Sequence, residues 1–259
     1  MKCRTAVRGA IALAMVLLPL ACIGSARADK ATIRVGVGNA MNATLVTPDG
    51  PGPYPAVLVL HTLGGVEPAD IAFAQRLAGE GYVALVPEYT AAYNVKWKTA
   101  RGAFTTLAQP IYDDLVAAEE TLRHNPKVAG SKVGAVGFSL GGLFAMWMAA
   151  TGKVDAGVTY YGALTAAGDD PTLERFRKAY TKASAPALIL QGTADNQVPV
   201  KSATDLADIV KAAQVPCEVR IYPGAFHKFD RDPGSDANGA AADAWQRTIA
   251  FLARYLKPS

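Results

Sequence analysis

The chain has 259 residues, with 26 Lys and Arg against 22 Asp and Glu, so its formal net charge is +4. The first 28 residues carry four of the basic side chains and no acidic one, which leaves 22 of each sign in the remaining 231 residues. Because residues 29–259 carry equal numbers of basic and acidic side chains, there is no electrostatic reason to expect nucleic acid as a partner. With 51% hydrophobic and 19% charged residues, the composition excludes intrinsic disorder, and the length predicts a single domain over residues 29–259.

Residues 1–28 have the pattern of a cleavable export signal. Three basic residues come first, at Lys2, Arg4 and Arg8. An apolar run follows over 9–24, and the tripeptide Ala26-Arg27-Ala28 then supplies the small residues that a signal peptidase accepts. We therefore expect a signal peptide, cleavage directly after this tripeptide, and a periplasmic or extracellular protein without stable membrane insertion.

Two other interpretations of this segment are weaker. An uncleaved anchor would need the apolar run to cross a bilayer, and Pro19 together with the Ala-x-Ala ending argues against it. A lipoprotein would be acylated at Cys22, but Pro19 stands where an aliphatic residue is expected. Beyond this segment the chain has only Cys217, so neither an intramolecular disulfide nor a multi-cysteine zinc site is expected.

Hydrophobic periodicity divides the rest of the chain into strands that alternate with helices. In chain order, we expect strands at 32–37, 43–46 and 56–61, a helix from 68 to 79 or 81, and a strand at 82–86. There follow a helix at 111–124, a strand at 132–138, a helix at 141–150, strands at 156–161 and 187–190, a helix at 202–213, a strand at 217–222 and a helix at 240–256. This alternation predicts an α/β fold with a mostly parallel, doubly wound sheet that carries helices on both faces.

The motif Gly137-Phe138-Ser139-Leu140-Gly141 lies between a predicted strand and a predicted helix. In a G-x-S-x-G motif the chain turns so sharply that the serine takes a strained backbone conformation, and glycines beside it avoid steric conflict. The strand before the motif and the helix after it are the context that such a turn requires. Ser139 is therefore the candidate nucleophile.

A serine hydroxyl needs a base to attack a carbonyl, and the chain has three histidines. In a doubly wound hydrolase the order along the chain is serine, acid, histidine. Only His227 lies downstream of Ser139, whereas His61 ends a predicted strand and His124 ends a predicted surface helix. His227 is therefore the candidate base.

The acid of such a triad stands at the carboxyl end of a strand, where ligand chemistry in open sheets is found. Asp195 follows the strand at 187–190 and meets this condition. Asp169 and Asp170 remain alternatives, although they occupy a polar turn and Asp170 could cap the helix after it.

Four segments together resemble the dienelactone hydrolase family of α/β-hydrolases. They are VLVLHTLGGVEPADIAFAQRLAGEGYVALVPEY, GFSLGG, LILQGTADNQVP and YPGAFHKF, and the resemblance runs from about Pro55 to the C-terminus. It implies an α/β-hydrolase fold, hydrolysis of small carboxylic esters or lactones, and no metal or organic cofactor. It also carries the triad over to Ser139, Asp195 and His227, and an oxyanion hole to the backbone N–H groups of Leu63 and Leu140.

The sequence departs from the founding type of this family at two positions. That type has Cys where Ser139 stands and Glu where Thr62 stands, so dienelactone itself is a doubtful substrate. Arg231 falls where the family has an arginine that contacts a substrate carboxylate, and a solvated loop arginine is the alternative. His61 and Thr62 are further candidate substrate contacts, although His61 is at least as well explained as a strand-end histidine. The segment 90–109 would either cover the site or form a separate hydrophobic cluster.

The combined prediction is an exported serine hydrolase that forms an acyl-enzyme, as a monomer or small homo-oligomer. Two other functions remain open. A peptidase of the prolyl oligopeptidase type has the same triad order, and a binding protein could keep the fold without catalysis.

Overall fold

The computed structural model describes residues 28–128, 130–166, 169–170 and 173–258. The strands are β1 (Asp29–Val35), β2 (Met41–Thr47), β3 (Ala56–Leu60), β4 (Val83–Pro87), β5 (Val133–Phe138), β6 (Ala156–Tyr160), β7 (Ala187–Gly192) and β8 (Cys217–Tyr222). The helices are α1 (Pro68–Gly79), α2 (Tyr89–Ala92), α3 (Ala100–Phe104), α4 (Ala108–Arg123), α5 (Leu140–Ala150), α6 (Glu174–Ala179), α7 (Val200–Ala212) and α8 (Ala240–Leu256). Short 3₁₀ turns lie at Val37–Asn39 and Trp97–Thr99.

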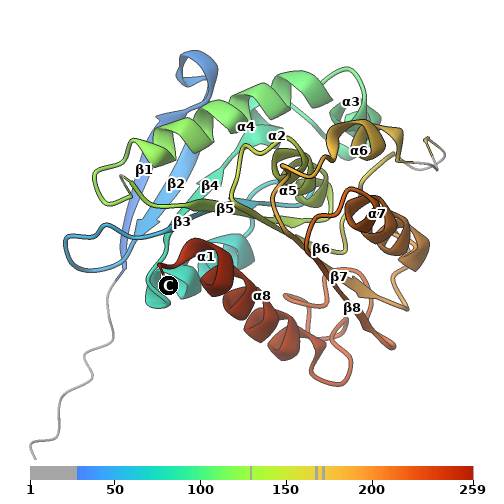
Figure 1. Cartoon of the computed structure of the whole chain (residues 1–259). Helices are drawn as coiled ribbons and strands as arrows, with labels where there is room; N and C mark the ends of the chain where they lie inside the picture. The colour runs from blue at the N-terminus through green and yellow to red at the C-terminus, as the bar shows by residue number, and fades with distance from the viewer. Residues whose placement is uncertain (1–27, 129, 167–168, 171–172, 259) are drawn as a thin grey trace, which may run out of the picture.

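The strands form one sheet in the order β1-β2-β4-β3-β5-β6-β7-β8 (Figure 1). β2 runs antiparallel to both β1 and β4, and every other neighbouring pair is parallel. The parallel strands β3 to β7 consist of buried residues along their whole length, as strands covered on both faces must. The mostly parallel sheet is as predicted.

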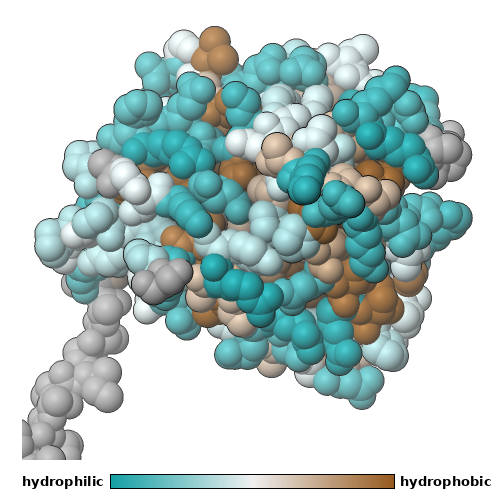
Figure 2. All heavy atoms as spheres, in the orientation of Figure 1, coloured by the Kyte–Doolittle hydropathy of each residue, from teal (hydrophilic) through white to brown (hydrophobic). Residues whose placement is uncertain are grey.

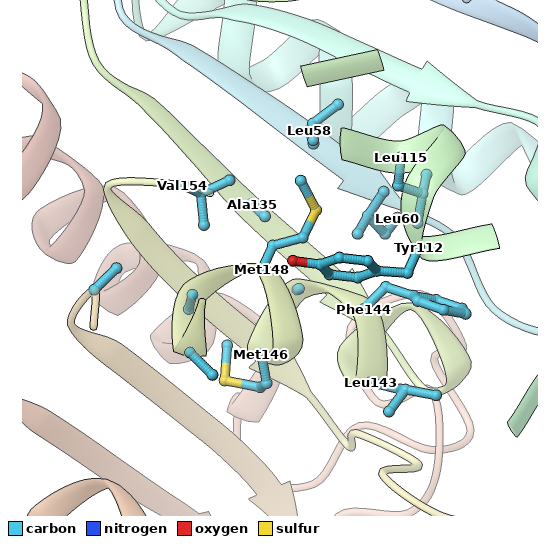
Figure 3. Packing of buried hydrophobic residues seen from close by; sticks show 14 of the residues in the cluster. Leu58, Leu60, Tyr112, Leu115, Ala135, Leu143, Phe144, Met146, Met148 and Val154 are labelled. Carbon is cyan, nitrogen blue, oxygen red and sulfur yellow. The ribbon is translucent and has the colours of Figure 1, made fainter. Parts of the chain in front are cut away.

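Two hydrophobic layers cover the sheet. On one face α1 and α8 pack together, so that Phe73 of α1 meets Trp245 of α8 edge to face. On the other face lie α4, α5 and α7, and Figure 3 shows Phe144 and Met148 of α5 packed close to Leu60 of β3. The central helix α5 is buried along nearly its whole length, because it begins at the middle of the sheet and α4 and α6 cover it.

The predicted strands and helices all occur, with ends that differ by a few residues. Sequence periodicity missed α2 and α3, since helices of four and five residues are too short to show a repeat. In the described residues of the polar stretch before β7, the structure has one helix, α6, of six residues. On the face shown in Figure 2, hydrophilic residues cover most of the surface and hydrophobic ones form smaller groups between them.

The predicted export signal lies outside the described residues except for its last position. Within the described part of the chain, no helix combines the length and the apolar character needed to cross a bilayer.

Candidate active site at the carboxyl edge of the sheet

Ser139 occupies a sharp turn between β5 and α5. Its backbone has φ 51° and ψ −114°, a conformation that residues with side chains rarely adopt. A Cβ at Gly137 would lie 2.1 Å from the carbonyl oxygen of Gly141, and one at Gly141 would lie 2.0 Å from the carbonyl oxygen of Leu60. These two glycines are therefore required by close backbone approach, and they let the strained turn present the Ser139 hydroxyl at the sheet edge.

His227 lies between Ser139 and Asp195. Its Nε2 is 3.1 Å from the Ser139 Oγ, and its Nδ1 is 2.8 Å from the Asp195 Oδ2. The imidazole is 5% exposed and the Asp195 side chain is fully buried, so water does not compete for their hydrogen bond. The structure thus brings together the three residues that sequence order selected, from the ends of β5, β7 and β8.

Asp195 is held in place by three other donors. The backbone N–H groups of Gln197 and Val198 donate to Oδ1 at 2.8 and 2.9 Å, and the Gln191 amide donates to Oδ2 at 3.0 Å. Burial acts to raise the pKa of Asp195, but the hydrogen bonds from His227 and from these N–H groups outweigh it and hold the pKa below its ordinary value. Asp195 is therefore ionised and fixed in orientation beside His227.

Gln191 was missed by sequence reasoning. It is 1% exposed at the end of β7, and its amide bonds both Asp195 and the carbonyl oxygen of Val198. The signal was present, because a single polar residue ends the otherwise apolar strand ALILQG. Such a residue in a buried strand needs a partner.

The alternative acid and base residues lie elsewhere. Asp169 pairs with Arg101, and Asp170 accepts a hydrogen bond from the Glu174 backbone N–H at 2.7 Å, at the start of α6. His124 is exposed at the end of α4, with its Nδ1 2.7 Å from the carbonyl oxygen of Glu120. Among the acids that the sequence left open, Asp195 is the one that contacts His227.

A cavity of about 340 Å³ opens beside Ser139. Its described lining residues are Leu63, Trp97, Ala100, Arg101, Phe104, Ser139, Leu140, Ala163, Thr165, Ala166, Gln197 and Val198. The two residues expected to supply oxyanion-hole N–H groups thus border the same cavity as the candidate nucleophile. The segment 90–109 contributes a wall through Trp97, Arg101 and Phe104, so part of it covers the site.

Three expected substrate contacts do not line this cavity. His61 is fully buried, with its ring stacked on Tyr89 at 4.1 Å, and Thr62 is 3% exposed, with its hydroxyl accepting from the Gly64 N–H. Arg231 is 5% exposed, so the alternative interpretation as a solvated loop arginine is wrong. Its guanidinium is held by buried carboxylates, which is also the reason why it does not reach the cavity.

Arg231 belongs to a buried cluster beneath the site. It donates to Asp70 of α1 at 2.8 Å and to Asp230 at 3.1 Å, and it lies over the ring of Phe138 at 4.2 Å. Asp230 also accepts the hydroxyl hydrogen of Tyr161. Burial raises the pKa of Asp230, and the neighbouring Arg231 opposes that shift.

Tyr161 connects this cluster to the candidate base. Its ring centroid is 4.6 Å from that of His227, and its backbone has a φ of 39°, unusual for an aromatic residue. The His227 loop is also tied to the residue before α1, because the Lys228 ammonium lies 3.0 Å from Glu67. The cluster therefore fixes the loop that carries His227.

His61 lies near this cluster and has a perturbed pKa. Burial lowers the pKa of His61 from its ordinary 6.5 to about 4, although its hydrogen bond with the Thr62 carbonyl oxygen opposes the shift. Its Nε2 has no hydrogen-bond partner among the described residues. As for metals, the described part of the chain contains no group of three or more His, Cys, Asp or Glu side chains arranged to hold an ion.

Similarity to known proteins shows the family to which the chain belongs. The sequence profile of the dienelactone hydrolase family matches residues 41–256. The chain belongs to the dienelactone hydrolase family. As a member, it is a carboxylic ester hydrolase with the α/β-hydrolase fold.

Proteins with similar sequences are named carboxymethylenebutenolidases or putative carboxymethylenebutenolidases. Putative carboxymethylenebutenolidases of Methylorubrum extorquens and Escherichia coli K12 are each 30% identical over 79% of this chain, and over 73% and 78% of their own lengths. A carboxymethylenebutenolidase of Rhodococcus opacus is 30% identical over 77% of this chain and 81% of its own.

Solved structures share the fold of this dienelactone hydrolase family member. A putative dienelactone hydrolase from Klebsiella pneumoniae superposes with a TM-score of 0.73 at 24% identity, over 88% of this chain and all of its own. An acylaminoacyl peptidase from Pyrococcus horikoshii gives 0.71 at 15% identity, over 90% of this chain but only 42% of the peptidase. At these identities the likeness concerns the fold alone.

Proposed function

We propose that this family member is an exported serine hydrolase that cleaves carboxylic esters or lactones through an acyl-enzyme. One observation carries the proposal: the continuous hydrogen-bond chain from Asp195 through His227 to Ser139 ends at an apolar cavity. No other nucleophile stands beside a base and an orienting acid in the part of the cavity lining that the structure describes.

In the first half-reaction, the Ser139 Oγ attacks the ester carbonyl carbon while His227 Nε2 takes its proton. The C–O bond to the leaving group then breaks, and His227 returns the proton to the departing alcohol. Asp195 accepts the Nδ1–H hydrogen bond throughout, which fixes the tautomer and stabilises the imidazolium. Because hydrogen bonds hold the pKa of Asp195 low, the carboxylate stays charged while His227 gains and loses its proton.

The tetrahedral intermediate places negative charge on the former carbonyl oxygen. The N–H of Leu140 is the first of α5, where N–H groups lack an intrahelical acceptor and the helix dipole favours an anion. Together with the N–H of Leu63 across the cavity, it would supply the oxyanion hole. In the second half-reaction a water attacks the acyl-enzyme under the same base, and the acid product leaves.

Substitution of the nucleophile tests the mechanism. Ser139→Ala should lower kcat for a short-chain aryl ester by about 10⁴ or more, since removal of one triad member removes most of the catalysis. Ser202→Ala, at the start of α7, serves as a serine control outside the triad. A fluorophosphonate probe should label the native protein and not Ser139→Ala. Near-normal ester hydrolysis by Ser139→Ala would refute the assignment.

The same assay separates the remaining functions. A non-catalytic binding protein would show neither turnover nor labelling. A peptidase of the prolyl oligopeptidase type would cleave matched amide substrates at rates comparable to esters, whereas the esterase mechanism proposed here gives far faster ester turnover.

Export is part of the proposal and rests on the sequence pattern of residues 1–28. Expression of the full chain in a bacterial host should give a periplasmic protein whose N-terminus is Asp29, measured by intact mass and N-terminal sequencing. Retention of residues 1–28, or a lipid-modified Cys22 at the N-terminus, would contradict it.

A further inference from the structure

The cavity beside Ser139 is mainly apolar. Trp97 and Phe104 supply aromatic surface, and Leu63, Leu140 and Val198 supply aliphatic surface. Trp97 is 71% exposed, so it borders the mouth of the cavity, whereas Leu63 and Phe104 are half-buried. Apolar walls favour a substrate group that leaves water when it binds.

Arg101 is the one ionisable side chain among the described lining residues of this cavity. Its guanidinium forms an ion pair with Asp169, whose side chain is 23% exposed. The positive charge at the cavity is thus already matched by a carboxylate of the protein, and an anionic substrate would have to compete with it.

The cations on the His227 loop are paired as well. Arg231 is buried against Asp70 and Asp230, and the Lys228 ammonium lies 3.0 Å from Glu67. Reaching a substrate would require Arg231 to leave two buried carboxylates without a cation, which is strongly unfavourable. Neither Arg101 nor the two cations of the His227 loop is therefore free to pair with a substrate carboxylate.

We propose that this site selects uncharged esters with an apolar acyl group and discriminates against carboxylate-bearing esters and lactones, with Asp169 as a specificity-determining residue. The proposal rests on the function proposed above and names its substrate class. Asp169 acts by neutralising Arg101, and the apolar walls act by leaving a substrate carboxylate with few hydrogen-bond donors. Among the described lining side chains these include Thr165 and Gln197, beside Arg101 and Ser139.

A pair of esters that differ in one terminal group tests the charge selection. 4-Nitrophenyl butyrate and 4-nitrophenyl hydrogen succinate share the leaving group, and their acyl chains end in a methyl and in a carboxylate. The rates compared are those that increase with enzyme concentration, because the succinate carboxylate also attacks its own ester and releases 4-nitrophenol without enzyme. We expect kcat/KM for the butyrate to exceed that for the succinate by about 100-fold, because an unpaired carboxylate in an apolar cavity is costly. Equal kcat/KM values would overturn the proposal.

Asp169→Asn tests the assigned residue. It releases Arg101 from its pair, so the ratio of succinate to butyrate kcat/KM should rise about fivefold, the size of one solvent-exposed ion pair. The added variant Arg101→Ala should abolish that rise. An unchanged ratio in Asp169→Asn would overturn the role of Asp169.

Asp205→Asn is a matched control. Asp205 pairs with Lys201 at 2.6 Å, and the exposures of these two side chains, 22% and 78%, resemble the 23% and 66% of Asp169 and Arg101. It does not line the Ser139 cavity. The ratio should stay at the native value in Asp205→Asn, and a similar rise there would show a general charge effect and contradict the proposal.

The outcomes also separate this inference from the proposed function. If neither ester is hydrolysed and the fluorophosphonate does not react, the serine hydrolase assignment fails. If both esters are hydrolysed at similar kcat/KM, the assignment stands and the substrate class proposed here is wrong.

Discussion

Two arginines near the candidate active site, Arg231 and Arg101, differ in their burial and in the strength of their ion pairs. Arg231 is 5% exposed and is held by carboxylates from α1 and from its own loop. Arg101 is 66% exposed, and its one ion-pair partner among the described residues is Asp169 at the cavity mouth. A buried pair is strongly coupled to the fold, because removing one partner strands a charge in a medium of low polarity. An exposed pair is weak and screened by salt, so it can adjust substrate choice without affecting folding.

The largest expected effect comes from breaking the buried pair. Arg231→Met keeps an extended apolar side chain over Phe138 but leaves Asp70 and Asp230 without their cation. We expect the free energy of unfolding to fall by about 3–5 kcal/mol, measured by denaturant titration at neutral pH. Activity on the folded fraction should fall by similar factors for neutral and anionic esters. A selective loss for the anionic ester alone would show that Arg231 contacts substrate after all.

His61 tests the buried region by its dependence on pH. Because burial lowers its pKa to about 4, the unfolded chain binds a proton below pH 6.5 that the folded chain does not. Stability contributed by neutral His61 is thus present above pH 6.5 and is lost as the pH falls toward 4, by about 3 kcal/mol in total. His61→Phe keeps a ring to stack on Tyr89 and should remove most of that slope. An unchanged slope between pH 6.5 and 4 would show that other groups cause it.

Tyr161→Phe should give a smaller effect where the buried cluster meets the proposed triad. The variant keeps the ring that packs on His227 but removes the hydroxyl that donates to Asp230. A lost hydrogen bond to a buried carboxylate costs about 2 kcal/mol of stability. We also expect kcat to fall severalfold with KM little changed, since the His227 loop loses a support and the cavity walls stay. Tyr82→Phe is the control, because the buried Tyr82 hydroxyl has no described partner. Equal kinetics in the two variants would limit Tyr161 to a packing role.

The smallest effect is expected at the cavity mouth. Arg101→Ala removes an exposed ion pair and should change the free energy of unfolding by less than about 1 kcal/mol. Denaturant titrations at low and high salt check this result. A loss comparable with that of Arg231→Met would remove the contrast between the two arginines.

Much of the site could be predicted because its signals are local or follow chain order. Gly137 and Gly141 predict the turn that holds Ser139. His227 is the single histidine that follows Ser139 in the chain, so chain order selects it as the candidate base. Apolar runs such as those of β3 and β5 predict buried parallel strands, and the carboxyl ends of such strands meet at one edge of the sheet.

The partners of Arg231 could not be predicted. Asp70 lies 161 residues earlier in the chain, and it meets Arg231 only after α1 and the β8–α8 loop pack on the same face of the sheet. The sequence shows where the arginines and the carboxylates lie along the chain, but it does not show which of them are buried together in the fold. For the same reason the sequence could not predict the walls of the cavity. They come from α3, the loop after β6 and the loop after β7, which meet only in the folded structure.

The close approach of Gly141 to Leu60 has a consequence for how this enzyme can change over evolution. The nucleophile turn and the strand that leads to Leu63 touch through main-chain atoms, so their relative placement does not depend on which side chains surround them. The pocket walls, in contrast, come mainly from connecting segments whose residues can be exchanged one at a time. New substrates can therefore be acquired by substitution in those segments while Ser139 and the proposed oxyanion donors keep their positions.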